Sequence, residues 1–215
     1  MRSESYRLPV LALALATTFV LSSNLIYGLF PSHDTRERFT ELWLLGANHR
    51  IEGLSSHVLD DEPIEVMVGI RNHMGDSVQY SLIVKLRNET EPLPDPSRAQ
   101  PSPLPMLCRF DVSLDENEGW EAPVTVRVVE ADISTGQCLL RKIEINGAIV
   151  TVKSLATRNE ETTGFCYELF FELWTRDSAN DTLLYDNRFV GFWLDVRYNA
   201  KGSLRTDRIT ANGGT

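Results

Sequence analysis

The stretch IEVMVGIRNHMGDSVQYSLIVKL, residues 64–86, decides the fold. Apolar side chains recur at every second position in its first part, 64–70, and again in its last part, 78–86. This period places the apolar residues on one face of an extended strand. Residues 72–77 lie between the two parts and supply the Gly and Asp that are typical of a turn. We therefore predict a hairpin of two half-buried strands.

Further short segments extend this pattern along the chain. The predicted strands are Glu41–Leu45, Val124–Val129, Cys138–Ile145, Ala148–Val152, Gly164–Trp174 and Asn187–Val196. No sustained helical period appears after the amino-terminal region. Short strands separated by turns are typical of an antiparallel β-sandwich, which we expect over residues 39–200. Residues 201–215 are polar and glycine-rich, and we predict a flexible tail there.

The amino terminus contains an uncharged run, residues 8–30, which reads LPVLALALATTFVLSSNLIYGLF. At about 1.5 Å per residue such a helix exceeds the roughly 30 Å of a bilayer core. Arg2 and Arg7 against Glu4 favour residues 1–7 in the cytoplasm, with 31–38 as a linker to an extracytoplasmic domain. A cleaved signal peptide and a buried core helix are the alternatives. We expect an uncleaved single-pass anchor in the cell membrane.

The composition excludes several classes of protein. Lys and Arg total 21 against 30 Asp and Glu, a net charge of −9, and no basic stretch stands out. Nucleic-acid binding requires clustered cations, so it is not expected. Catalytic and nucleotide-binding motifs are missing, and we expect no catalytic, cofactor or metal site. Residues 115–119, DENEG, resemble the opening of a calcium loop, but position 12 is Val126, so a solvated turn is the prediction.

A proline-rich insertion, residues 88–112, interrupts the strand pattern. Six of the ten prolines lie in it: Pro92, Pro94, Pro96, Pro101, Pro103 and Pro105. Proline cannot donate to a β-ladder, so this segment should be extended and polyproline-like. It is either a docking segment for a partner protein's groove or a stiff surface loop.

Two kinds of covalent modification are predicted. Outside the cell one disulfide could form among the three cysteines, and Cys108 with Cys138 would close a loop around the acidic turn, although sequence cannot assign the pairing. Asn88 and Asn180 begin N-x-[ST] sequons at predicted strand ends, and both are candidate glycosylation acceptors.

Residues at both ends of the predicted domain carry a family resemblance. FTELWLLG at 39–46 and VGIRNH at 68–73, then YELFFELW at 167–174 and FWLDV at 192–196, resemble the archaeal family called domain of unknown function sixteen-sixteen. The resemblance covers roughly residues 36–198. It implies an extracytoplasmic, immunoglobulin-like β domain attached to membrane helices, in a family without an assigned activity. Room for a single membrane helix and the proline-rich insertion both depart from the family pattern.

Three classes of function are compatible with these features. We favour a non-enzymatic, membrane-anchored protein whose outer β-sandwich binds other membrane or cell-surface proteins as an accessory or structural subunit of a complex. The first alternative is a pilin-like filament subunit, against which the lack of Gly in residues 1–7 counts. The second is an envelope glycan-binding protein or enzyme that uses aromatic platforms such as Trp120 or Trp193.

Overall fold

The computed structural model describes residues 17–18, 37–50, 63–158, 164–177, 180–198 and 204–214. The chain divides into two compact units, Met1–Glu37 and Arg38–Thr215. Of the predicted anchor, only Thr17 and Thr18 are described, and both are helical; the rest of residues 8–30 and the predicted cytoplasmic segment 1–7 lie outside the described residues. Within the described parts of the chain, no helix is both long and apolar enough to cross a membrane.

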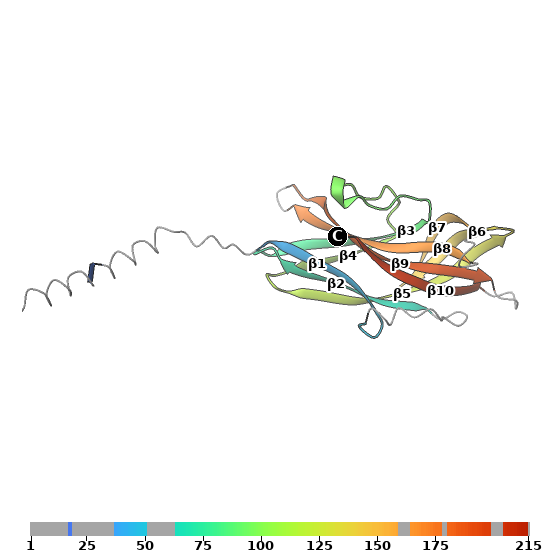
Figure 1. Ribbon diagram of the computed structural model, residues 1–215, viewed down its shortest axis with the longest axis horizontal. Helices are drawn as coiled ribbons and strands as arrows, with labels where there is room; N and C mark the ends of the chain where they lie inside the picture. Colours follow the sequence, from blue (N-terminus) through green and yellow to red (C-terminus); the bar gives the residue numbers. More distant parts are fainter. Residues whose placement is uncertain are drawn as a thin grey trace, which may run out of the picture. The chain divides into compact units, whose positions relative to one another are not determined.

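The second unit consists of two five-stranded antiparallel sheets (Figure 1). Sheet A has the order β1-β2-β5-β6-β7 and sheet B the order β10-β9-β8-β3-β4. The strands of sheet A are β1 Phe39–Gly46, β2 Ile64–His73, β5 Gly119–Ser134, β6 Gln137–Ile145 and β7 Ala148–Thr157. Those of sheet B are β3 Val78–Asn88, β4 Cys108–Leu114, β8 Phe165–Asp177, β9 Thr182–Tyr198 and β10 Leu204–Gly214. The predicted all-β class is confirmed.

The alternation read from the sequence builds one core between the sheets. Val66, Val68 and Ile70 of β2 are completely buried, as are Leu82 and Val84 of β3. Burying each such side chain stabilises the fold by about 1.5–3 kcal/mol relative to leaving it in water. The core therefore holds the sheets together through the faces that the period of two predicted.

The predicted hairpin between residues 64–70 and 78–86 is wrong. β2 pairs with β1 and β5 in sheet A, whereas β3 pairs with β4 and β8 in sheet B. The Nδ2 of Asn72, at the end of β2, donates to the carbonyl oxygens of Asp76, Leu114 and Asp115 at 2.8, 2.9 and 3.2 Å. These bonds fix a corner at which the chain passes from one sheet to the other, so both strands can bury their apolar faces against each other.

Three further connections refine the predictions. β6 and β7 are joined by Asn146 and Gly147, whose φ angles of 48° and 81° are those of a two-residue hairpin turn. Leu204–Gly214, predicted to be a flexible tail, pairs with β9 as β10, because a strand edge offers backbone partners even to a polar segment. β4 begins at Cys108, so the proline-rich insertion ends earlier than predicted.

Candidate functional site: the proline-rich strap on sheet B

The segment between β3 and β4, residues 89–107, is called the strap here, and it runs along the outer side of sheet B (Figure 1). It contains one short 3-10 helix, η2, Pro96–Arg98. The six predicted docking prolines divide by environment: Pro94 is buried, Pro96 and Pro101 are half-buried, and Pro92, Pro103 and Pro105 are exposed. The strap is therefore bound to its own sheet by part of its length and presents the rest to solvent.

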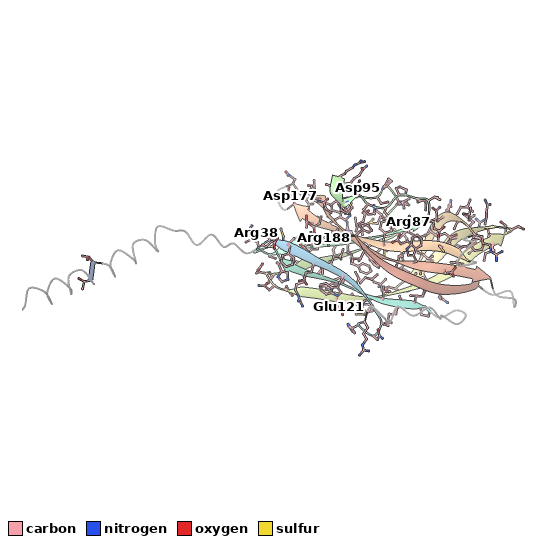
Figure 2. All side chains as sticks on the ribbon, viewed as in Figure 1. Arg38, Arg87, Asp95, Glu121, Asp177 and Arg188 are labelled. Carbon is pink, nitrogen blue, oxygen red and sulfur yellow. The ribbon has the colours of Figure 1, made fainter. Side chains whose placement is uncertain are left out.

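Asp95 sets the local conformation at η2. Its carboxylate accepts hydrogen bonds from the backbone N–H groups of Ser97 and Arg98 at 3.1 and 3.3 Å. It also accepts a bond from the Ser97 hydroxyl, and this bond is the main reason why the pKa of Asp95 lies below its ordinary value. This is the usual chemistry of a helix N-cap. Figure 2 shows Asp95 on the opposite side of the unit from Glu121 of sheet A.

A buried ion pair clamps the middle of the strap to sheet B. Lys85 of β3 and Glu172 of β8 point out of the sheet, and Lys85 Nζ lies 2.9 Å from Glu172 Oε2 with the side chains 7% and 0% exposed. Ser102 of the strap completes the arrangement, since its N–H donates to Glu172 Oε1 at 2.7 Å and its carbonyl accepts from Lys85. Trp174 Nε1 also donates to Glu172, at 3.1 Å. Both oxygens of the carboxylate are thus satisfied, as a buried charge requires. We call this the clamp.

A second buried pair lies at the amino-terminal end of the strap. Arg87 Nε donates to Glu168 Oε2 at 2.6 Å, and the guanidinium carbon lies 4.9 Å from the ring centroid of Trp193. Arg87 Nη1 donates to the carbonyls of Asn88, Glu89 and Glu91, where the strap begins. One arginine therefore joins β3, β8, β9 and the first strap residues; Figure 2 labels it.

Glu168 is less completely hydrogen-bonded than Glu172. Its side chain is completely buried, and its Oε1 has no hydrogen-bond partner among the described residues. Burial raises its pKa above the ordinary value, and the neighbouring Arg87 offsets only part of that rise. Gly191 of β9 makes room for this carboxylate, since a Cβ at Gly191 would lie 3.0 Å from Glu168 Oε1.

Aromatic side chains lie on the same face beside the clamp. The rings of Trp174 and Tyr185 are 5.6 Å apart, and those of Phe170 and Phe189 are 6.4 Å apart in an edge-to-face arrangement. Burial raises the pKa of Tyr185, and the nearby negative charges of Glu172, Asp186 and Asp95 add to the rise. The strap, which carries Asp95, is therefore close to this aromatic group.

The two cysteines of the predicted disulfide are free thiols. Cys108 begins β4 in sheet B, opposite Val84, whereas Cys138 lies in β6 of sheet A, opposite Ala156 and Ile133. The two residues belong to different sheets, and the predicted Cys108–Cys138 bond is not formed in this structure. Burial raises the pKa of the Cys108 thiol to about 11.

The two predicted glycosylation acceptors differ in environment. Asn88 ends β3, and its side chain contacts both the strap and β7. Asn180 lies exposed in the connection between β8 and β9.

The acidic turn 115–119 connects β4 to β5. Its Glu116 accepts from the N–H of Gly75, and its Asn117 Oδ1 lies 3.0 Å from His73 Nδ1, so the turn braces the corner after β2. Among the described residues, no three His, Cys, Asp or Glu side chains are grouped as metal ligands. A shallow depression of about 250 Å³ lies nearby on sheet B and is lined by Gln79, Tyr80, Ser81, Asp111, Val112, Ser113 and Arg176.

Residues 33–135 match the model of a family described as Domain of unknown function (DUF1616). This segment, a little under half of the chain, is similar to DUF1616. The resemblance predicted from the sequence is thereby confirmed, for a region that runs from before β1 into β5 and includes the strap and the corner at Asn72. The carboxyl-terminal part of the resemblance, in β8 and β9, lies beyond the DUF1616 match.

No curated protein matches the chain. Solved structures with some likeness include a calcium-binding mutant of Bacteroides uniformis beta-glucuronidase 2, at 10% identity and a TM-score of 0.33 over 77% of this chain and 14% of that one. Beta-glucosidases are also found. DesR from Streptomyces venezuelae is 11% identical, with a TM-score of 0.23 over 82% of this chain and 15% of DesR. The Kluyveromyces marxianus beta-glucosidase is 11% identical, with a TM-score of 0.26 over 81% of this chain and 15% of that enzyme. The chain thus spans about a seventh of these enzymes, and TM-scores this low support no conclusion about it.

The buried charges under the strap were not predicted from the sequence. A signal was present, because Lys85 and Arg87 occupy the outward positions of β3, and Glu168 and Glu172 occupy those of β8. Charges at alternate positions are usually solvated, and only the strap's path shows that Glu172 is covered. The strap lies within the predicted insertion, residues 88–112, but the last five residues of that range belong to β4, and the attachment of the strap to the sheet was not foreseen.

Proposed function

We propose that this protein is a non-enzymatic, single-pass membrane protein whose outer immunoglobulin-like sandwich binds another membrane or cell-surface protein through the strap. Residues 8–30 act as the uncleaved anchor, with the amino terminus in the cytoplasm. The uncharged length of that run and the flanking Arg2 and Arg7 support the anchor and its orientation. The DUF1616 match assigns no activity, so the argument for binding rests on the strap.

The observation that carries the proposal is the way the strap is held. The clamp fixes Ser102, and immediately after it Pro103, Pro105 and Met106 face solvent, with Met106 54% exposed. Prolines restrict the backbone, and the clamp restricts it further, so this surface loses little conformational entropy when a partner binds. Exposed prolines beside a flexible apolar side chain suit a groove lined with aromatic residues.

The buried carboxylates favour binding over catalysis. Glu168 and Glu172 of β8 pair with the two cations that hold the strap, and neither has exposed surface. Glu172 already has three donors. These groups are therefore placed to hold the strap in position, and a substrate in solution could not reach them without displacing it.

The test uses the full-length chain with a carboxyl-terminal tag, extracted from native membranes in mild detergent. Co-purifying proteins are compared between wild type, a Pro105→Ser/Met106→Ser variant, and the control Ile149→Ser. Ile149 is 63% exposed on β7 of sheet A, so its substitution removes a similar apolar surface elsewhere. We expect stoichiometric partners to be lost only from the strap variant. Equal retention by all three proteins would refute strap-mediated binding, and a partnerless, monomeric wild type would refute the interaction function.

A further inference from the structure

We propose that Asn180 is the glycan acceptor of the folded protein and that Asn88, despite an equally complete sequon, is a structural residue that stays unmodified. This inference rests on the proposed extracytoplasmic location, because glycans are transferred to such sequons outside the cytoplasm. It separates two sites that the sequence motif alone treats alike.

The side chain of Asn88 is bonded on both ends of its amide. Its Oδ1 accepts from the N–H and the hydroxyl of Thr90, both at 2.8 Å, and from the N–H of Glu91 at 2.9 Å. Its Nδ2 donates to the carbonyl of Leu155 on β7 at 2.9 Å. The hydroxyl of Thr90, the third sequon residue, is therefore also committed to the turn. These bonds tie the end of β3 to the start of the strap and to sheet A.

The Asn88 amide is half-buried and lies against β7. A depression of about 60 Å³ is lined by Asn88, Glu89, Thr90, Leu155, Ala156 and Thr157. A glycan attached to Nδ2 would replace one of the two hydrogens on the atom that bonds to Leu155 of β7, so it competes with that contact. Folding and glycosylation therefore oppose each other at this position.

The environment of Asn180 is the reverse. It is exposed in the connection between β8 and β9, and its Nδ2 donates to Asp177 Oδ2 at 3.0 Å, a surface contact that water can replace. Asp181 has a φ of 52°, as in a tight turn, and Thr182 is exposed at the first position of β9. The sequon thus projects from the unit, where a transferase and a glycan can be accommodated.

The transfer itself needs a donor of known chemical class, a glycan linked through phosphate to a lipid. The amide nitrogen of Asn180 bonds to the anomeric carbon, and the bond from that carbon to the phosphate oxygen breaks. The phosphate leaves with the bonding electrons, and one amide proton passes to a base on the transferase. The side chain keeps its carbonyl oxygen and one N–H.

The experiment maps glycans on the full-length tagged chain made in a eukaryotic host that glycosylates N-x-[ST] sequons in its secretory pathway. A peptide-N-glycosidase converts each modified Asn into Asp, and mass spectrometry of the peptides locates it. The matched variants Thr90→Ala and Thr182→Ala inactivate one sequon each while keeping both asparagines. We expect wild type and Thr90→Ala to carry one glycan, at Asn180, and Thr182→Ala to carry none.

Two outcomes overturn the inference: a glycan on Asn88, or an empty Asn180 on exported protein. Export is measured separately, by digesting sealed microsomes with protease, since a tag inside the lumen is protected. A protected tag with an empty Asn180 refutes the inference and leaves the proposed function standing. A digested tag refutes the extracytoplasmic location and the inference with it. As an independent check on Asn88, Asn88→Gln should lower the thermal midpoint, whereas Asn180→Gln should not.

Discussion

Replacing Lys85 by Met tests whether the clamp holds the strap through a buried charge. The substitution keeps the length of the side chain but leaves the fully buried Glu172 without its cation. Removing one partner of a buried ion pair typically costs about 3–5 kcal/mol, a large share of the roughly 5–15 kcal/mol that stabilises a domain. Glu172 still accepts from Ser102 and Trp174, so the expected loss lies at the lower end, about 3 kcal/mol.

The assay is urea unfolding of the full-length chain, followed by tryptophan fluorescence, with amide hydrogen exchange at Ser102 as a local measure. The double variant Lys85→Met/Glu172→Gln removes the charge but keeps an acceptor for the N–H of Ser102, so it should recover more than half of the loss. Arg98→Met is the control, because its pair with Asp95 is on the surface and its loss should leave stability unchanged. A loss below about 1 kcal/mol, or a double variant no more stable than the single one, would refute the clamp.

Three further perturbations follow from the structure. Burial raises the pKa of Glu168 in the folded state above its ordinary value of 4.5, so wild type should gain stability relative to Glu168→Gln as the pH falls from neutral through that raised pKa, with no further gain below 4.5. Urea unfolding across this pH range measures the difference in unfolding free energy between the two proteins. If the carboxylate titrated normally, this difference would not change with pH. Gly69→Ala places a Cβ in steric overlap with the Trp43 indole, and it should cost about 1–3 kcal/mol of stability with a shift in tryptophan fluorescence. Adding Trp43→Ala in the same chain should relieve this penalty. Cys108, with a pKa near 11, should react with alkylating agents far more slowly at pH 7 than a free thiol does, and labelling at the rate of free cysteine would contradict its burial.

The sequence predicted most of the strands, β4 and β10 excepted, because apolar side chains recur at alternate positions in them. β3 shows this most clearly: Tyr80, Leu82 and Val84 were predicted on one face and all three line the core. The pairing of strands was less accessible. The turn after β2 has the composition of a hairpin turn, and nothing in residues 74–77 indicates that Asn72 would bond to Leu114 and Asp115, some 40 residues later. The corner thus depends on contacts between residues that lie far apart in the sequence.

The candidate site was predictable in position but not in construction. Six clustered prolines located the strap, since proline cannot join a sheet. The composition of the segment does not show whether it packs on the sheet. In the structure it does, because the N–H of Ser102 donates to the buried carboxylate of Glu172 in β8. Likewise, the two sequons are indistinguishable as motifs, and only the contacts from Asn88 to Leu155 separate them. The local sequence shows the composition of a segment. It does not show which residues of a distant strand will lie beside that segment in the fold.

The order of strands in sheet B has a consequence for synthesis on the ribosome. Arg87 leaves the ribosome 81 residues before Glu168, its partner. At about 5–20 residues per second, β3 therefore waits roughly 4–16 s before β8 exists. During this interval its apolar face and its two cations have only β4, the strap and the strands of sheet A as partners. A strap that follows β3 directly in the chain, and reaches it without waiting for β8, is well placed to shield the nascent strand from other chains.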